Sequence, residues 1–231
     1  MINLLLFIFQ LIILFLLARS FSKHFFRFWF ILTKSKIWSI RLMSVFLLPG
    51  TLIHELSHWL VAEILQVPTG KMSLMPEVVD GSGVKLGSVQ IARTDVFRRT
   101  LIGLAPLLIG LVLIGLLVLV IPSDVLACRD WNCGLGIVLP LVGVFLVSNT
   151  MFSSKKDLEA AFVPFGMVIF FGFAAWWFKW RLPQQLVVDL DSLIGKMNVA
   201  FGVTIGVNMV FLLVVQMLTG LAGKVLGRRI V

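Results

Sequence analysis

Three side chains in the apolar stretch 42–65 have the types and the spacing that metal binding requires. His54, Glu55 and His58 form the pattern H-E-x-x-H. In an α-helix, residues four apart lie about 40° apart around the axis and one turn apart along it, so both imidazoles can bind one Zn²⁺. Glu55 stands beside the first histidine. There it can hold a water molecule, take its proton as a general base and deliver that proton to a leaving amine.

The alternatives are a chance match and a pair of histidines packed in a helix bundle. The chain holds 3 histidines. Two of them fall in this motif, with a glutamate between them in a stretch otherwise almost free of charge. Because an ionisable side chain at membrane depth is costly to bury, such a residue predicts a functional site. The motif therefore favours a metal site over both alternatives.

A catalytic zinc site needs a third protein ligand and an open position for water. Glu63 is the nearest acid, but it points about 180° away from His54 around a helix. Asp157 stands at the junction of two apolar stretches. The other aspartates of the second half fall in segments that we expect in water: Asp124, Asp130, Asp189 and Asp191. We predict Asp157 as the third ligand, with Glu77 and Asp80 as the next candidates.

The composition places this motif in a membrane. Of the 231 residues, 59% are hydrophobic and 13% are charged, whereas an ordinary soluble domain has about 25% charged residues. The formal net charge of +9 lies largely in loops and at the ends of apolar runs, where basic side chains meet lipid headgroups. It therefore predicts a bilayer partner and no nucleic acid. We expect an integral, multi-pass protein of the cell membrane with a single domain.

The apolar runs predict about six transmembrane helices. Their approximate bounds are 2–17, 42–65, 101–121, 135–147, 160–178 and 199–221. Between the first two, a basic stretch rich in Phe and Trp, 19–41, is expected at the membrane interface. The predicted fold class is an all-α polytopic membrane protein.

The polar segment 67–99 predicts a short, membrane-associated β-hairpin. It is rich in glycine, and apolar residues alternate in it at Val84, Leu86, Val89 and Ile91. This alternation is the period of a strand with one buried face. The hairpin would follow the helix that carries the motif.

The two cysteines stand close together in a polar segment between two spans. Cys128 and Cys133 can form a small disulfide if that segment faces an oxidising compartment, and their spacing alone leaves this open. With no histidine beside them, they make a poor zinc site.

In the order of these elements the chain resembles the site-2 protease family of intramembrane zinc metalloproteases. Its members carry H-E-x-x-H in a transmembrane helix, then a β-hairpin, a span with a Gly-Pro element, and an Asn followed eight residues later by a zinc-binding Asp. This chain has its motif, the Gly-rich segment 71–93, Gly103 with Pro106, and Asn149 with Asp157 at the eighth position. The resemblance covers residues 46–162.

The chain departs from the family pattern near the third ligand. The family usually has prolines between the Asn and the Asp and a glycine directly after the Asp. Here Lys155 and Lys156 precede Asp157, and Leu158 follows it. In addition, two residues separate Gly103 from Pro106, which opens the Gly-Pro pair. The two lysines predict a wetter site than the family usually has.

The resemblance implies a zinc ion held by His54, His58 and Asp157, Glu55 as general base and then acid, and Asn149 bonding the backbone of an unwound substrate helix. It implies a protease-like core at 42–162 with peripheral helices at 1–41 and 163–231. The hairpin, the metal and the C-terminus would face the cytoplasm, although the basic residues of the loops leave the orientation undecided. The implied partners are a transmembrane protein substrate and a regulatory membrane protein.

Two functions stay open at this stage. One is a zinc-dependent intramembrane endopeptidase. The other is a non-catalytic membrane receptor or assembly subunit on the same scaffold, in which zinc is structural or absent. Glu55 favours the enzyme, because a scaffold needs no carboxylate beside two metal ligands. For Asn149, a turn residue is an equal alternative to a substrate-binding residue.

Overall fold

The computed structural model describes the helices and the strands that surround the motif. It covers residues 2–74, 77–79, 83–85, 87–121, 131–152 and 183–225, together with residues 166, 170 and 177. In this part of the chain, five helices are long and apolar enough to span a membrane. The predicted span 160–178 lies, apart from three positions, outside the described residues, so the count of six spans stays a prediction.

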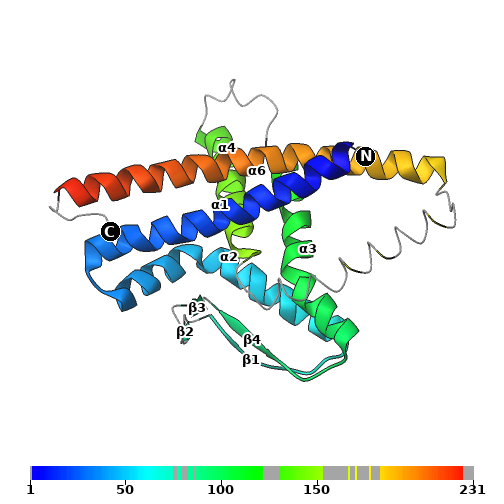
Figure 1. The fold of residues 1–231 in the computed structure, drawn as a ribbon, viewed down its shortest axis with the longest axis horizontal. Helices are drawn as coiled ribbons and strands as arrows, with labels where there is room; N and C mark the ends of the chain where they lie inside the picture. Colours follow the sequence, from blue (N-terminus) through cyan, green and yellow to red (C-terminus); the bar gives the residue numbers. More distant parts are fainter. Residues whose placement is uncertain are drawn as a thin grey trace.

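The first two helices form an antiparallel pair (Figure 1). α1 (Ile2–Thr33) ends where Lys34 adopts a φ of 55°, and its N–H bonds the carbonyl of Phe30 at 3.0 Å. Ser35 then caps α2 (Lys36–Ile64). The segment 19–41 therefore contains the end of α1 and the start of α2, and its place at the membrane interface stays a prediction.

The buried aromatic rings of α1 explain this continuation. Phe21 and Phe25 lie one turn apart and stack with ring centroids 5.0 Å apart. Phe21 also packs edge-on against Phe145 at 4.9 Å. Arg19, Lys23 and Arg27 can extend their long side chains away from the apolar face, so they do not end α1.

Three further helices complete the described bundle. They are α3 (Val96–Val120), α4 (Trp131–Thr150) and α6 (Gln184–Val225). Each begins before the predicted span. The start of α6 precedes its predicted span by the most residues. This added part of the helix includes the polar residue Asp191, whose carboxylate accepts a hydrogen bond from Asn3 of α1 at 2.8 Å.

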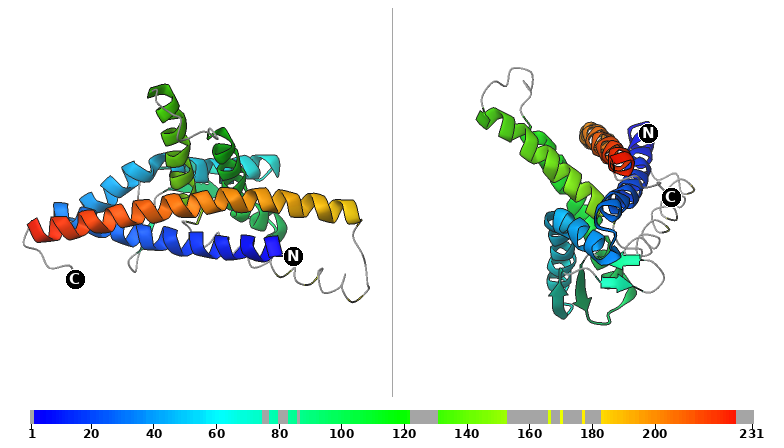
Figure 2. Two further views of the ribbon diagram at one scale, coloured as in Figure 1. Left: turned by 90° about the horizontal axis from the view of Figure 1, so that it is seen from above. Right: turned by 90° about the vertical axis from the view of Figure 1, so that its left-hand side faces the viewer.

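α1 and α6 lie side by side and run in the same direction, while α3 and α4 cross them (Figures 1 and 2). Their shared direction is visible in two contacts, because Asn3 bonds Asp191 and Gln10 bonds the carbonyl of Asn198 at 3.1 Å. The core between the helices is apolar. Many large apolar side chains on the outer faces are exposed, Leu119 by 79%, as expected for surfaces that face lipid.

The predicted β-hairpin is confirmed in two paired sections. β1 (Thr69–Ser73) pairs antiparallel with β4 (Ser88–Ile91), and β2 (Glu77–Val79) pairs antiparallel with β3 (Gly83–Lys85). At its base, Val67 packs in a buried cluster with Ala62 of α2 and Ile102 of α3. The cluster holds the base of the hairpin against α2, which carries the motif, and against α3.

Candidate metal centre

The three motif residues lie on a buried face of α2. His54 is 4% exposed, Glu55 5% and His58 8%. Leu56 and Trp59, which lie outside this face, are exposed. The helical spacing predicted from the sequence is therefore confirmed, and the two imidazoles and the carboxylate share a site shielded from bulk solvent.

The two imidazole rings have a separation that fits a shared metal ion. The ring centroids of His54 and His58 are 4.9 Å apart, with an interplanar angle of 85°. Two imidazoles that bind one tetrahedral zinc at about 2.0–2.1 Å have ring centres roughly 5 Å apart. The residues present therefore fit two of the three ligands of a catalytic zinc.

A backbone carbonyl of α3 orients His58. Its Nδ1 lies 2.8 Å from the carbonyl oxygen of Ile102. Because a carbonyl only accepts, Nδ1 must donate, which leaves Nε2 as the nitrogen with a lone pair for a metal. Second ring nitrogens of metal-binding histidines are typically held in this way.

Pro106 explains why that carbonyl is available. In a regular helix, the carbonyl of Ile102 would accept from the N–H of residue 106. Proline has no N–H, so this bond cannot form. The oxygen of Ile102 instead accepts from His58 across the α2–α3 contact. The proline of the opened Gly-Pro element thus acts through the backbone.

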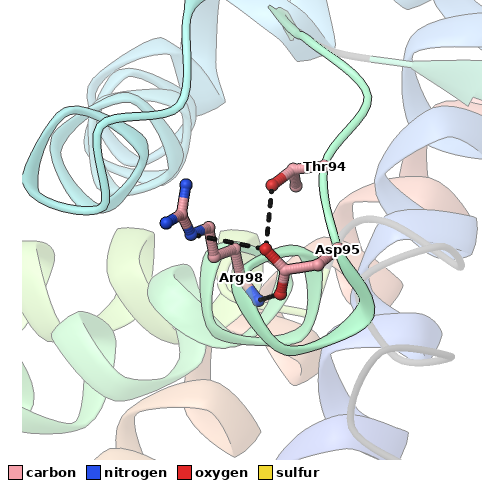
Figure 3. A network of polar contacts seen from close by, with 3 residues as sticks. All are labelled: Thr94, Asp95 and Arg98. Carbon is pink, nitrogen blue, oxygen red and sulfur yellow. Dashed lines mark hydrogen bonds and ion pairs between the residues drawn. The ribbon is translucent and has the colours of Figure 1, made fainter.

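The start of α3 is fixed by a cap close to this contact (Figure 3). Asp95 accepts from the backbone N–H of Arg98 at 3.0 Å, and the Arg98 guanidinium lies 3.3 Å from the same carboxylate. That backbone hydrogen bond, aided by the charge of Arg98, lowers the pKa of Asp95 below its ordinary value of 3.8. The cap sets the register from which Ile102 reaches His58.

The hairpin lies directly on Glu55 at Gly87. A Cβ placed on this buried glycine would lie 2.9 Å from Oε1 and 3.0 Å from Cγ of Glu55, and 2.9 Å from Cγ2 of Thr51. Real Cβ atoms essentially never have contacts as short as the two 2.9 Å distances, so Glu55 and Thr51 would have to shift. Only glycine lets the backbone before β4 approach the carboxylate this closely.

The predicted third ligand, Asp157, lies outside the described residues, as does the alternative Asp80. Within the part of the chain that the structure describes, no group of three or more His, Cys, Asp and Glu side chains forms a metal site. Glu63 is exposed and accepts a hydrogen bond from Thr69 at 2.8 Å, as expected for an acid that faces away from His54. The third ligand stays a prediction.

Asn149 lies buried in the last turn of α4, close to α2. Leu146 and Thr150, on either side of it in sequence, face Gly50. A Cβ on that glycine would lie 2.6 Å from the Leu146 carbonyl oxygen and 2.7 Å from Thr150 Oγ1. Since Gly50 is one turn before His54, the end of α4 packs next to the motif.

Two residues that position the motif were missed by the sequence reasoning. Ile102 acts through its backbone, and its residue type carries no signal for that. Gly87 belongs to a Gly-rich segment whose hairpin was predicted, but its contact with Glu55 depends on how the hairpin folds back. For Ile102, the available signal was Pro106 four residues later.

Comparisons with protein-family models, curated proteins and solved structures find no match to this chain. The assignment of the site therefore rests on the geometry of its own residues.

Proposed function

We propose that this protein is a zinc-dependent intramembrane endopeptidase that hydrolyses peptide bonds of membrane-spanning substrates. One observation carries the proposal. His54 and His58 face each other at the separation of two zinc ligands, with Glu55 between them in sequence, on the buried face of an apolar helix. The site-2 protease resemblance points to the same activity.

The residues have separate roles in this proposal. His54, His58 and Asp157 hold the metal, which acts as a Lewis acid toward the scissile carbonyl and lowers the pKa of a water molecule. Glu55 takes the proton of that water and later gives it to the leaving amine. The bond between His58 and Ile102 keeps the histidine in the metal-binding tautomer.

The hairpin supplies what a membrane-embedded substrate needs. A peptide bond inside a transmembrane helix is shielded, so the substrate must be extended before water attacks it, and its backbone groups then need new partners. A strand edge offers such partners. Gly87 brings the hairpin backbone to Glu55, so a segment paired along the hairpin would pass the carboxylate.

A non-catalytic receptor or assembly subunit is the second candidate. Such a protein would have the same helices and the same hairpin as the proposed endopeptidase. The close approach of Gly87 to Glu55 favours the enzyme, because a carboxylate enclosed beside two histidines has a use in proton transfer.

Metal analysis tests the site itself. Protein purified without chelator should hold one Zn²⁺ per chain. The metal should be lost in His58→Ala, weakened in Asp157→Asn and kept in Glu55→Gln, because Glu55 is beside the metal and not a ligand. Purified wild type without a stoichiometric transition metal would contradict the proposal.

Cleavage of a transmembrane peptide tests the activity. Glu55→Gln should lower kcat by about 10²-fold or more, with fold and zinc retained, because it removes the general base. Glu63→Gln is the matched control, since this exposed glutamate lies on the same helix away from the histidines. Equal cleavage by wild type and Glu55→Gln would favour the scaffold function instead.

A further inference from the structure

A buried polar network joins the end of α4 to the middle of α6. Asn149 is 5% exposed and Asn208 2%. The two amides are bonded to each other at 2.6 Å, and Ser148 and Thr204 complete the network. Such a network in an apolar bundle is costly unless each polar atom is satisfied, so its hydrogen bonds can be counted group by group.

The orientation of Asn208 is fixed by its own hydrogen bonds. Its Nδ2 donates to Ser148 Oγ at 2.8 Å and to the Thr204 carbonyl at 2.9 Å. An amide carries two such hydrogens, so both are used. A flipped amide would point its oxygen at the carbonyl of Thr204, which has no hydrogen to give. Asn208 Oδ1 therefore faces Asn149 as an acceptor.

Asn208 in turn fixes the orientation of Asn149. Nδ2 of Asn149 donates to Asn208 Oδ1 at 2.6 Å and to the Phe145 carbonyl at 2.8 Å, which uses both of its hydrogens. Its Oδ1 is buried and has no hydrogen-bond partner among the described residues. That oxygen can only accept, so the group that completes the network must bring an N–H or O–H.

We infer that Asn208 is a positioning residue that presents the Oδ1 of Asn149 to a backbone N–H of the substrate. This inference rests on the proposed function. An extended peptide has N–H groups without helical partners, and an acceptor with no hydrogen of its own selects them. The turn of α4 that holds Asn149 packs through Leu146 and Thr150 on Gly50, one turn before His54, so the bond would form near the motif.

This role brings α6 into the site. Asn208 lies outside the region of family resemblance, 46–162, and reaches the site only through Asn149. Without Asn208, one amide hydrogen of Asn149 would lose its partner, and the amide could rotate and offer a donor where the substrate needs an acceptor. Substrate binding would then weaken, while the chemistry at Glu55 would stay unchanged.

The test compares two buried asparagines of α6. Asn208→Ser keeps a hydroxyl that can bond the Thr204 carbonyl one turn back, as other hydroxyls in these helices do, but it does not reach Asn149. Asn198→Ser is the matched control, because Asn198 is 7% exposed and bonds α1 through the Asn3 carbonyl. The probe is a single-span Leu/Ala peptide with a central Gly-Pro pair, in phosphatidylcholine vesicles.

Asn208→Ser should raise KM about fivefold, the effect of one lost hydrogen bond, with kcat nearly unchanged. Asn149→Ala should do the same, and the double variant should show no further increase, because Asn208 acts through Asn149. Asn198→Ser should leave KM unchanged. Additive effects in the double variant, or equal KM values for Asn208→Ser and Asn198→Ser, would overturn the inference.

A binding measurement separates this inference from the proposed function. In a Glu55→Gln background, the Kd of the same peptide should rise about fivefold on Asn208→Ser. If Glu55→Gln still cleaves the peptide, the proposed function is wrong. The Kd still tests separately whether Asn208 contributes to peptide binding. If Asn208→Ser does not fold, Ser148→Ala removes a partner of Asn208 from the other side and should also raise the Kd. An unchanged Kd would count against Asn208.

Discussion

At the scale of single residues, the candidate site depends on backbone groups as much as on side chains. His58 is held in one tautomer by the carbonyl of Ile102, and that carbonyl is available because Pro106 has no N–H. Partners of this kind orient metal-binding histidines and contribute to metal affinity. In the proposed zinc site, Pro106 would therefore act on metal affinity only indirectly, through His58.

Pro106→Ala should weaken zinc binding by about tenfold, because a new N–H at position 106 competes with His58 for the Ile102 carbonyl. Competition with a chelator measures the affinity. Pro140→Ala is the control, since Pro140 is also a buried helix proline but lies in α4. Wild-type zinc affinity in Pro106→Ala would show that the carbonyl is not shared in this way.

At the scale of elements, the hairpin and α2 form one unit around Glu55. Gly87→Ala should displace the carboxylate, because the new methyl group would lie 2.9 Å from Oε1. We expect kcat to fall by roughly 10–100-fold with zinc retained. Peptide cleavage and metal content measure the two effects.

Gly70→Ala in the same hairpin is the matched control. Its Cβ would also lie 2.9 Å from an oxygen, but this is the end of the exposed Gln90 side chain, which can move. Its kcat should match that of wild type. Equal losses in the two variants would mean that general damage to the hairpin, and not the contact with Glu55, lowers the activity.

The cap of α3 makes a pH-dependent contribution to stability. The pKa of Asp95 is lowered in the folded protein, so its stabilisation is present above the ordinary value of 3.8 and is lost as the pH falls through the lowered pKa. Asn caps a helix without titrating. The thermal midpoint of wild type in detergent should therefore fall more steeply below pH 3.8 than that of Asp95→Asn. Parallel pH profiles would exclude this role.

At the scale of the whole molecule, the direction of α1 and α6 bears on the membrane topology. α6 has 42 residues and α1 has 32, about 63 and 48 Å at 1.5 Å per residue, whereas the hydrocarbon core is about 30 Å thick. Helices this long must tilt or extend beyond the core. This agrees with the way α3 and α4 cross them in Figure 1.

Since α1 and α6 run in the same direction, they cross the membrane in the same sense. This requires an odd number of spans between them. An even total of spans, such as the predicted six, would make them antiparallel. We therefore expect the start of α1 and the end of α6 on opposite faces, with the start of α1 on the side of the hairpin. Reporters fused before Met1 and after Val225 measure this, and reporters on one face would contradict it.

The cysteines indicate which face is which. Cys133, near the start of α4, is disulfide-bonded, while Cys128 lies outside the described residues. Disulfides persist in oxidising compartments. Because α3 separates the hairpin from this segment, we expect the hairpin and Glu55 on the reducing side if α3 spans the membrane. The side of the hairpin agrees with the orientation implied by the family resemblance, whereas the end of α6, expected on the opposite face, differs from the cytoplasmic C-terminus that the resemblance implies.

The sequence by itself determined the features that depend on local spacing. The face shared by His54, Glu55 and His58 follows from the helical period, and the hairpin follows from alternation and glycine. The apolar runs located the described helices, although their ends shifted, because residues such as Asp191 fit a helix once a partner from α1 satisfies them.

Only the tertiary structure decided which distant groups meet at the site. The carbonyl of Ile102 is 44 residues from His58, and Asn208 is 59 residues from Asn149. A backbone carbonyl is the same in every residue, and an isolated Asn in an apolar helix does not indicate its partner. The direction of α6 relative to α1 likewise follows from packing and hydrogen bonds between these two helices, which hydropathy does not encode.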